Sequence, residues 1–254
     1  MLKTRIIPVL LLKNGRMVKG RQFKDFRDVG DPVSAARIYN AQNADELVFL
    51  DIDASVEKRT TLVDIIERVS RECFMPLSVG GGISSLDHIR SLLKAGADKV
   101  VITTAAVENP GLIREAATMF GSQCIVVGID VKRDPSGRLH VYTHSGKVWT
   151  PVVLLEHLRN MEVLGAGEVL LNSIDHDGMM QGYDLDLASE VSKATHLPVI
   201  LSGGAGDFQH LVDAITKAGV HAVACASIFH FGDNNPIRAR SFLKNHGILV
   251  KMTK

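Results

Sequence analysis

The chain has 254 residues, of which 46% are hydrophobic and 22% are charged. This composition excludes a disordered chain and is typical of a compact protein with a large buried core. The formal net charge is +1, and charges of both signs are mixed along the sequence, so the charge balance gives no reason to expect a nucleic acid or a membrane surface as partner. We therefore expect any anion to be bound at a local site.

Three cysteines, Cys73, Cys124 and Cys225, lie in apolar text and show no CxxC spacing. We predict buried free thiols, rather than a disulfide or a zinc site, in a protein of the reducing cytoplasm. His140 and His144 are spaced i, i+4, but no third ligand candidate accompanies them in the sequence. We therefore predict no metal site and no cofactor.

A signal peptide is one alternative for the N-terminus, because Lys3 and Arg5 precede an apolar run at residues 6–12. The run is short, and Lys13 to Arg16 follow it in place of a small-residue cleavage site, which favours a buried strand. No apolar stretch approaches the roughly 18 residues that span a bilayer. We predict no membrane partner.

Short apolar, β-branched runs alternate with segments of helical period along the chain. Asp31-Pro32 and Ser84 are start signals of helices, and Ala218-Gly219 is a stop signal. The predicted strands cover residues 6–12, 46–52, 75–79, 98–104, 124–130, 168–174, 197–201 and 221–227.

Eight alternations of strand and helix, with no linker rich in Pro, Gly or Ser, favour a closed α/β barrel over an open doubly wound sheet. We predict a single (β/α)8 TIM barrel domain over residues 1–254. The segments LVFLDIDAS and MPLSVGGGIS recur as VLLNSIDHDG and LPVILSGGAG about 122 residues later. This repeat indicates two fused half-barrels, with a two-fold pair of equivalent sites at the strand ends.

Glycine turns follow the third and seventh predicted strands, and hydroxyl residues end the fourth and eighth. Glycine lets the backbone approach a ligand, and the free N–H groups and dipole of the next helix favour an anion. Tight turning alone is the alternative, but the symmetric pair favours two phosphate sites and an elongated ligand with a phosphate at each end. The predicted phosphate-binding residues are Gly81, Gly82, Thr103 and Thr104 at one site and Gly203, Gly204 and Ser227 at the other.

Carboxylates follow several predicted strands, where a buried charge needs a ligand, a helix terminus or a cation as partner. Asp130 ends the fifth strand, and we predict that it acts in catalysis or contacts the ligand. Asp51 and Asp177 follow the second and sixth strands. Lys19, in the polar segment 13–30, is a candidate for a mobile lid, with a solvated lysine as the alternative.

Charged residues of alternating sign begin four of the predicted strands: Arg5, Glu46, Lys99 and Glu168. If all four point into the barrel, they close its floor as a salt-bridged ring. If they point outward, they are ordinary solvated strand starts, and the sequence leaves both alternatives open. Residues 133–150 form an excursion that we expect to fold as a small hairpin over the mouth of the barrel.

The motifs MVKG, DELVFLDI, ASVEKR, VGGGI, GADKV, TAAVENP, SGGAG and FHF stand at family-like spacing, and the chain resembles the HisF family over essentially its whole length. HisF is the cyclase subunit of imidazole glycerol phosphate synthase. The resemblance implies a barrel that receives ammonia from a HisH-like glutaminase docked on its floor. Arg5, Glu46, Lys99 and Glu168 match the ammonia gate of that family, and the two glycine and hydroxyl sets match its phosphate sites, with Thr103 in place of the usual asparagine.

In the HisF family, two aspartates act as general acid and base on a formimino substrate that carries two phosphates. Asp130 matches one of them, and Leu11 stands at the position of the other. Because Arg5 and Leu11 are six residues apart, a regular strand points both the same way and places Leu11 inside the mouth. Leucine cannot transfer a proton, and a positioned acid or base contributes about 10²- to 10⁴-fold to a rate. Asn172 and Met179 also depart from the family, each where it has a threonine, and we expect a less polar mouth.

The stretches IIPVLLLK and ECFMP resemble a paralogous branch, the glycosyl amidation-associated or WbuZ-like HisF proteins of bacterial surface polysaccharide pathways. This resemblance implies ammonia supply to a separate sugar amidotransferase, which converts an acetamido group to an acetamidino group. We predict such a paralog, with Asp130, Asp177 and Lys19 as the catalytic candidates. The alternatives are a genuine histidine-pathway cyclase, with Asp177 or Asp51 as second proton carrier, and a subunit without turnover or a phosphosugar isomerase.

Overall fold

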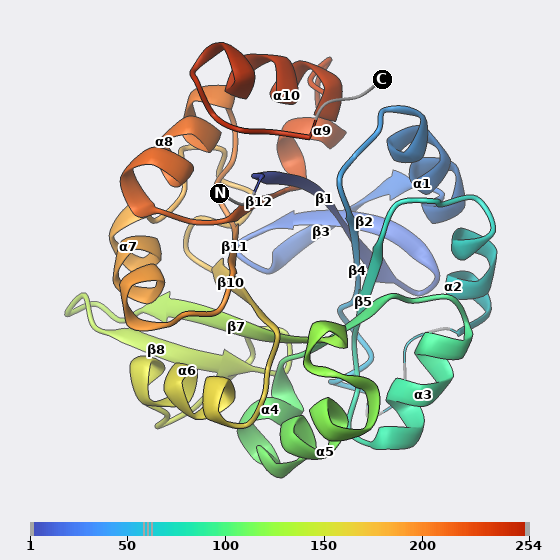
Figure 1. The fold of residues 1–254 in the computed structure, drawn as a ribbon, viewed down its shortest axis with the longest axis vertical. Helices are drawn as coiled ribbons and strands as arrows, with labels where there is room; N and C mark the ends of the chain where they lie inside the picture. Colours follow the sequence, from blue (N-terminus) through green and yellow to red (C-terminus); the bar gives the residue numbers. More distant parts are fainter. Residues whose placement is uncertain (1–2, 58, 60, 62, 252–254) are drawn as a thin grey trace.

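A computed structural model describes residues 3–57, 59, 61 and 63–251. Eight parallel strands form a closed barrel, because β12 pairs with β1 and β10 pairs with β7. The eight predicted strands are present, and the predicted (β/α)8 barrel is confirmed (Figure 1). The barrel strands are β1 (Arg5–Lys13), β4 (Leu47–Asp51), β5 (Leu77–Gly80), β6 (Lys99–Ile102), β7 (Ile125–Arg133), β10 (Glu168–Ser173), β11 (Val199–Ser202) and β12 (Ala222–Cys225).

Helices surround the strands as an outer ring (Figure 1). The start of α1 follows the sequence signal, because the Asp31 carboxylate accepts a hydrogen bond from the Ser34 N–H at 2.8 Å. The start of α3 lies one residue later than expected, because Ser85 rather than Ser84 accepts from the His88 N–H. Within the described residues, no helix is long and apolar enough to cross a lipid bilayer. The helices are α1 (Pro32–Ala41), α2 (Val63–Ser70), α3 (Leu86–Lys94), α4 (Thr104–Glu108), α5 (Gly111–Phe120), α6 (Leu154–Val163), α7 (Leu185–Ala194), α8 (Phe208–Ala218), α9 (Ser227–His230) and α10 (Pro236–Asn245).

The core has two layers, because successive side chains of a strand point to opposite faces. On β1, Ile6, Leu10 and Leu12 face the helices and belong to the larger apolar cluster. Ile7 and Leu11 face the barrel axis, where a second cluster fills the interior. Its members are Ile7, Val9, Leu11, Val18, Val48, Val101, Val126, Leu170, Ile200, Ala222 and Ala224.

Two hairpins extend barrel strands at their carboxyl ends. The polar segment 13–30 forms β2 (Arg16–Arg21) and β3 (Lys24–Gly30), which continue antiparallel from β1. The excursion at residues 133–150 forms β8 (Leu139–Thr143) and β9 (Val148–Trp149), which pair antiparallel beyond β7. The expectation of a hairpin in this excursion is therefore confirmed.

Candidate functional site

The floor of the barrel carries a closed ring of four charges. Arg5 donates to Glu46 at 2.8 Å and to Glu168 at 2.6 Å, and the Lys99 ammonium lies 2.9 Å from Glu46 and 2.8 Å from Glu168. The four side chains therefore point into the barrel and at one another. The alternative of solvated strand starts is wrong, because each side chain is bonded across the barrel.

Each charged side chain of the ring contacts two side chains of opposite sign. Burial disfavours the charge on Arg5, but Glu168 and Glu46 outweigh burial and raise the pKa of its guanidinium. Burial of Glu168 acts against its charge as well, yet Arg5 and Lys99 hold the pKa of its carboxyl below the ordinary value. Glu46 is 1% exposed, and its second oxygen accepts a hydrogen bond from Ser78 Oγ at 2.6 Å. The floor is thus a neutral and closed polar layer beneath an apolar interior.

The mouth of the barrel contains a cavity of about 400 Å³. Its wall is formed by the carboxyl ends of the barrel strands and by residues of both hairpins. All the predicted catalytic and phosphate-binding residues line this one cavity: Lys19, Gly81, Gly82, Thr103, Thr104, Asp130, Asp177, Gly203, Gly204 and Ser227.

The two glycine turns lie on opposite sides of the mouth, since β5 and β11 are four places apart in the closed order of eight strands. Gly82 and Gly203 have left-handed φ values of +62° and +90°. A Cβ on Gly203 would lie 2.6 Å from the Ser173 carbonyl oxygen, so neighbouring backbone also requires a glycine there. Tight turning and ligand approach therefore both demand glycine at these positions.

The helices that follow the two glycine turns, α3 and α8, both begin with a side-chain cap. The α8 N-terminus is already capped, because the Asp207 carboxylate accepts a hydrogen bond from the Gln209 N–H at 2.8 Å. The α3 N-terminus is capped by Ser85 in the same way. An anion at either turn would therefore rest on glycine backbone and on neighbouring hydroxyls. Ser227 Oγ fits this role, because it is buried and has no hydrogen-bond partner in the described structure.

Asp130 is the most perturbed acid that lines the mouth. Burial raises the pKa of its carboxyl to about 7, and the nearby Asp177 acts in the same direction. The side-chain amide of Asn172 donates to Asp130 at 3.4 Å and works against this rise. A carboxyl with a pKa near neutrality can both give and take a proton at neutral pH, which suits a general acid or base.

Lys19 lies on β2 and is 3% exposed. Its ammonium is 2.6 Å from Asp177, so the alternative of a solvated lysine is wrong. The predicted lid segment is the hairpin of β2 and β3, and the Gln22 N–H donates to the Asp177 carbonyl oxygen at 2.7 Å. Lys19 and Gln22 therefore hold this hairpin against the loop that follows β10.

Leu11 lies where the strand period predicts. It is 8% exposed, belongs to the interior cluster and lines the cavity. Asn172 and Met179 stand where the HisF family has threonines. Asn172 lines the cavity and Met179 is not among its lining residues, so the departure at Asn172 changes the mouth. The wall at Leu11 is apolar, and Asp130 lines the same cavity.

The other carboxylates at strand ends have structural partners. Asp51 accepts hydrogen bonds from Arg59 at 2.6 Å and from the Ala54 N–H at 3.2 Å. Asp175 accepts from the Arg133 N–H at 2.8 Å. Both carboxylates are held by these contacts. Asp177 pairs with Lys19 through Oδ1 and keeps Oδ2 without a partner among the described residues, so it is the better candidate for a second acid or base at the mouth.

The sequence interpretation missed several residues that line the cavity. His144 was considered only as a metal ligand, and within the described residues no group of three or more His, Cys, Asp or Glu side chains could hold a metal. The expected hairpin over the mouth was the signal for His144, because its turn must reach the cavity. The other missed residues are Phe23, Phe26, His88 and Glu108.

A closed barrel with a cavity at the carboxyl ends of its strands is the architecture of (β/α)8 enzymes, which carry their active sites at that face. The acid near neutrality and the paired glycine turns lie at this face here. Residues 5–235 match the model of the family described as histidine biosynthesis protein. The match covers most of the chain, and the chain belongs to this family of HisA- and HisF-type barrel enzymes.

Proposed function

We propose that this chain is a HisF-like synthase subunit that receives ammonia from a HisH-like glutaminase at its floor and releases it at its mouth. The ammonia serves the amidination of a sugar, from an acetamido to an acetamidino group, in bacterial surface polysaccharide synthesis. The charged ring supports the first half of this proposal. Arg5, Glu46, Lys99 and Glu168 close the end of the barrel opposite to the mouth, where ammonia from a docked glutaminase would enter.

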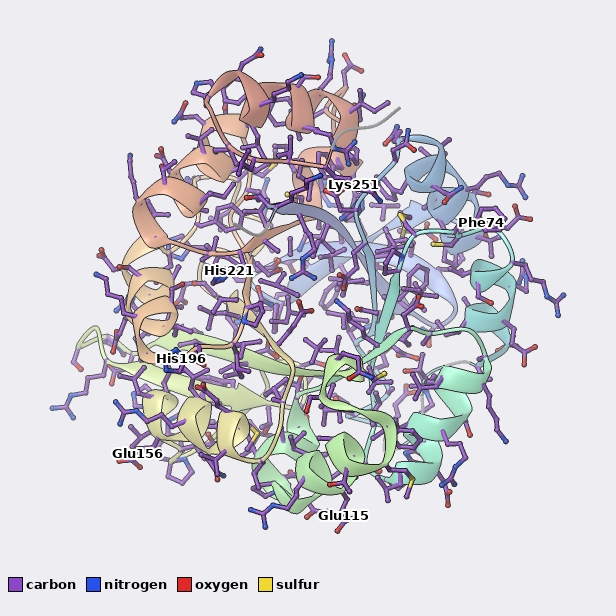
Figure 2. The ribbon with its side chains drawn as sticks, in the orientation of Figure 1. Phe74, Glu115, Glu156, His196, His221 and Lys251 are labelled. Carbon is purple, nitrogen blue, oxygen red and sulfur yellow. The ribbon has the colours of Figure 1, made fainter. Side chains whose placement is uncertain are left out.

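The exposed Phe74 supports docking of a partner at the floor. It lies between α2 and β5, on the face of the barrel where the strands begin (Figure 2). The residue is 86% exposed, the largest value among the exposed large hydrophobic residues of the described chain. A partner that covers the floor would bury this ring and gain about 25 cal/mol per Å² of apolar surface.

The observation that carries the proposal is Leu11 at the mouth. Ring closure by a HisF cyclase requires a second carboxylate at this position, and Leu11 instead packs against the apolar interior of the barrel. Ammonia that arrives at the mouth would lie beside Asp130, and β1 provides no second carboxylate opposite to it. This favours delivery of ammonia over imidazole formation in the barrel.

The two glycine turns support a phosphorylated ligand at the mouth. Such a ligand would rest on Gly82 and Thr104 at one end and on Gly203 and Ser227 at the other, all of which line one cavity. The sugar amidotransferase that uses the ammonia would be a further protein partner.

A genuine histidine-pathway cyclase is the second candidate. Membership of the histidine biosynthesis family, the pKa of about 7 at Asp130 and an unpartnered Oδ2 of Asp177 favour it. In that case Asp177 would supply the second proton transfer. Asp51 is the weaker choice, because Arg59 holds its carboxylate.

A cyclase assay separates the two candidates. The unaltered chain, Leu11→Asp and Leu11→Asn are each incubated with ammonia at high pH and the formimino substrate that carries two phosphates. We expect imidazole glycerol phosphate only from Leu11→Asp, with a gain of about 10²-fold or more, because aspartate restores a proton carrier and asparagine does not. Rapid product formation by the unaltered chain would overturn the proposal in favour of the cyclase.

A docking assay tests the glutaminase partner. Adding this chain to a HisH-like glutaminase is expected to raise glutamine hydrolysis and to form a complex in analytical ultracentrifugation. Phe74→Asp is expected to abolish both, while Phe231→Asp, a change at a 55% exposed ring after α9, leaves them intact. Equal effects of the two variants would contradict docking at the floor.

A further inference from the structure

The turn between β8 and β9 has a strained backbone. His144 and Ser145 have φ values of +51° and +55°, a left-handed conformation that residues other than glycine rarely adopt. Two consecutive residues of this kind cost free energy, and such strain persists only where the surrounding structure enforces it. The Lys147 N–H closes the turn by donating to the Thr143 carbonyl oxygen at 3.1 Å.

The strained turn is fixed to strand ends on both sides of β5. The Ser145 hydroxyl donates to the carbonyl oxygen of Ile52, just after β4, at 2.5 Å. The His144 N–H donates to Thr104 Oγ1, just after β6, at 3.1 Å. Since β5 lies between β4 and β6 in the sheet, the turn lies over the Gly81–Gly82 segment that follows β5.

The bond from His144 also orients the Thr104 hydroxyl. Because the oxygen accepts the His144 N–H, its own proton must point elsewhere, and no described residue accepts a hydrogen bond from it. An O–H group polarised in this way is a stronger donor. Both Thr104 and His144 line the cavity, and the hydrogen bond between them places the two residues at the same end of the mouth.

His140 on the same hairpin provides a contrast. Its Nε2 lies 2.9 Å from the Asp134 carboxylate and its Nδ1 accepts from the Trp149 indole at 2.9 Å, so both ring nitrogens are occupied. Among the described residues, the charged partner of the His144 Nε2 is Glu108, at 3.8 Å, and the Nδ1 lies 3.2 Å from the Thr143 hydroxyl. The imidazole of His144 can therefore turn a donor toward a ligand.

We propose that His144 is an anion-binding residue of the mouth, so that the hairpin of β8 and β9 completes the site at Gly82 and Thr104 for a phosphate monoester or a similar tetrahedral dianion. The inference rests on the proposed function only in that a phosphorylated ligand occupies the mouth. It assigns a role to the excursion that neither the barrel fold nor the ammonia path requires.

Charged groups around His144 determine how strongly a protonated imidazole at this position would attract an anion. Glu108 on α4 is the nearest and is mostly exposed, so it orients the ring without neutralising it fully. His88 on α3 lines the same cavity and adds positive charge when protonated. The remaining titratable groups of the cavity wall are Lys19, Asp51, Asp130 and Asp177.

The test is a sulfate titration of the isolated chain, followed through the backbone amide signals of Gly82 and Gly203 by NMR. Sulfate keeps both charges between pH 8 and pH 5.5, whereas imidazole side chains gain a proton in this range. At Gly82 we expect sulfate to bind about threefold more tightly at pH 5.5 than at pH 8, the size of one partly exposed ion pair. In a His88→Gln background, His144→Gln is expected to remove this pH dependence, and His140→Gln is expected to keep it.

Gly203 reports on the opposite site and should respond equally in the unaltered chain and in both variants. In a Thr104→Val background, His144→Gln is expected to cause little further loss, because one bound anion uses both groups. A Gly82 response that is unchanged by His144→Gln, or one that changes equally at Gly203, would overturn the proposal. The readout needs neither ammonia nor turnover, so its failure is distinct from failure of the proposed function.

Discussion

The floor and the mouth of this barrel are built from the same strands, but the polar groups are paired at the floor and partly unpaired at the mouth. At the floor, each of the four charged side chains contacts two of opposite sign within 3.0 Å. At the mouth, Asn172 Oδ1, Asp177 Oδ2 and Ser227 Oγ are buried without a partner among the described residues. The charges of the floor are paired within the chain, whereas these three polar atoms of the mouth are unpaired among the described residues.

The difference follows from the cost of burying polar groups. A buried polar atom without a hydrogen bond costs about 1 to 3 kcal/mol, so the three unpaired atoms of the mouth lower the stability of the isolated chain. The closed ring avoids this cost at the floor. Asp130 shows the same contrast, since burial raises the pKa of its carboxyl while the floor holds the pKa of Glu168 down.

The largest expected effect comes from opening the ring. Glu46→Ala leaves Arg5 and Lys99 with one carboxylate and removes the acceptor of Ser78. We expect unfolding in urea to show a loss of about 3 to 5 kcal/mol, the cost of breaking a buried charge network. Glu72→Ala, which breaks the exposed pair with Arg37, is the control and should cost less than about 1 kcal/mol. Equal losses would refute the contrast between ring and surface.

Leu11→Asp should have the next largest effect. The change places a carboxyl group in the interior cluster and removes apolar packing, which we expect to lower stability by about 2 to 4 kcal/mol at pH 8. The loss should be smaller at pH 5, where the buried acid takes up a proton. A stability equal to that of the unaltered chain at pH 8, measured by urea unfolding, would show that residue 11 is not packed in the interior.

Two buried serines compare the floor and the mouth directly. Ser78→Ala removes a 2.6 Å bond to Glu46 and should cost about 2 kcal/mol, since a bond to a charged group is worth more than a neutral one. Ser227→Ala removes an oxygen without a partner and should change stability by less than about 0.5 kcal/mol. A comparable loss of stability in both variants, measured by thermal unfolding, would contradict the prediction that the Ser227 hydroxyl has no partner in the isolated chain.

The last prediction concerns the pH dependence of stability at Asp130, which is a slope and not a single loss. Its pKa is about 7 in the folded chain, above the ordinary value of 3.8. The folded state therefore holds a proton between these values that the unfolded state has lost, and stability from this group falls as pH rises through the window. The slope approaches about 1.4 kcal/mol per pH unit.

Asp130→Asn removes this titration and should become progressively more stable than the unaltered chain from pH 5 to pH 8. Urea unfolding at four pH values measures the difference. Stability curves that run parallel across this range would show that the Asp130 carboxyl is not destabilised by burial.

The position of Leu11 was predictable from the sequence because a strand alternates its faces every residue. Arg5, Ile7 and Leu11 share one face of β1, as the period of two requires. The glycine turns after β5 and β11 were predictable for a similar reason, since the internal repeat marks equivalent strand ends. The caps at Asp207 and Ser85, on the helices that were expected to contribute to anion binding, are known only from the structure.

The partners of the charged groups were not predictable from the sequence. Arg5 and Glu168 are 163 residues apart and meet only because the barrel closes. Asp51 was a candidate acid until the structure placed Arg59 against it, and Lys19 was expected in a mobile or solvated segment but is buried against Asp177. His144 reaches Thr104 across 40 residues through a strained turn that no local pattern announces.

The sequence by itself determined the eight strands, the inward face of each and the chemical character of the two ends of the barrel. These properties depend on the local period of apolar residues and on glycine, which act within a few positions of the chain. Only the tertiary structure decided which charges pair at the floor and which polar atoms stay unpaired at the mouth. Pairing depends on strand order and register, which bring together side chains that are distant in sequence.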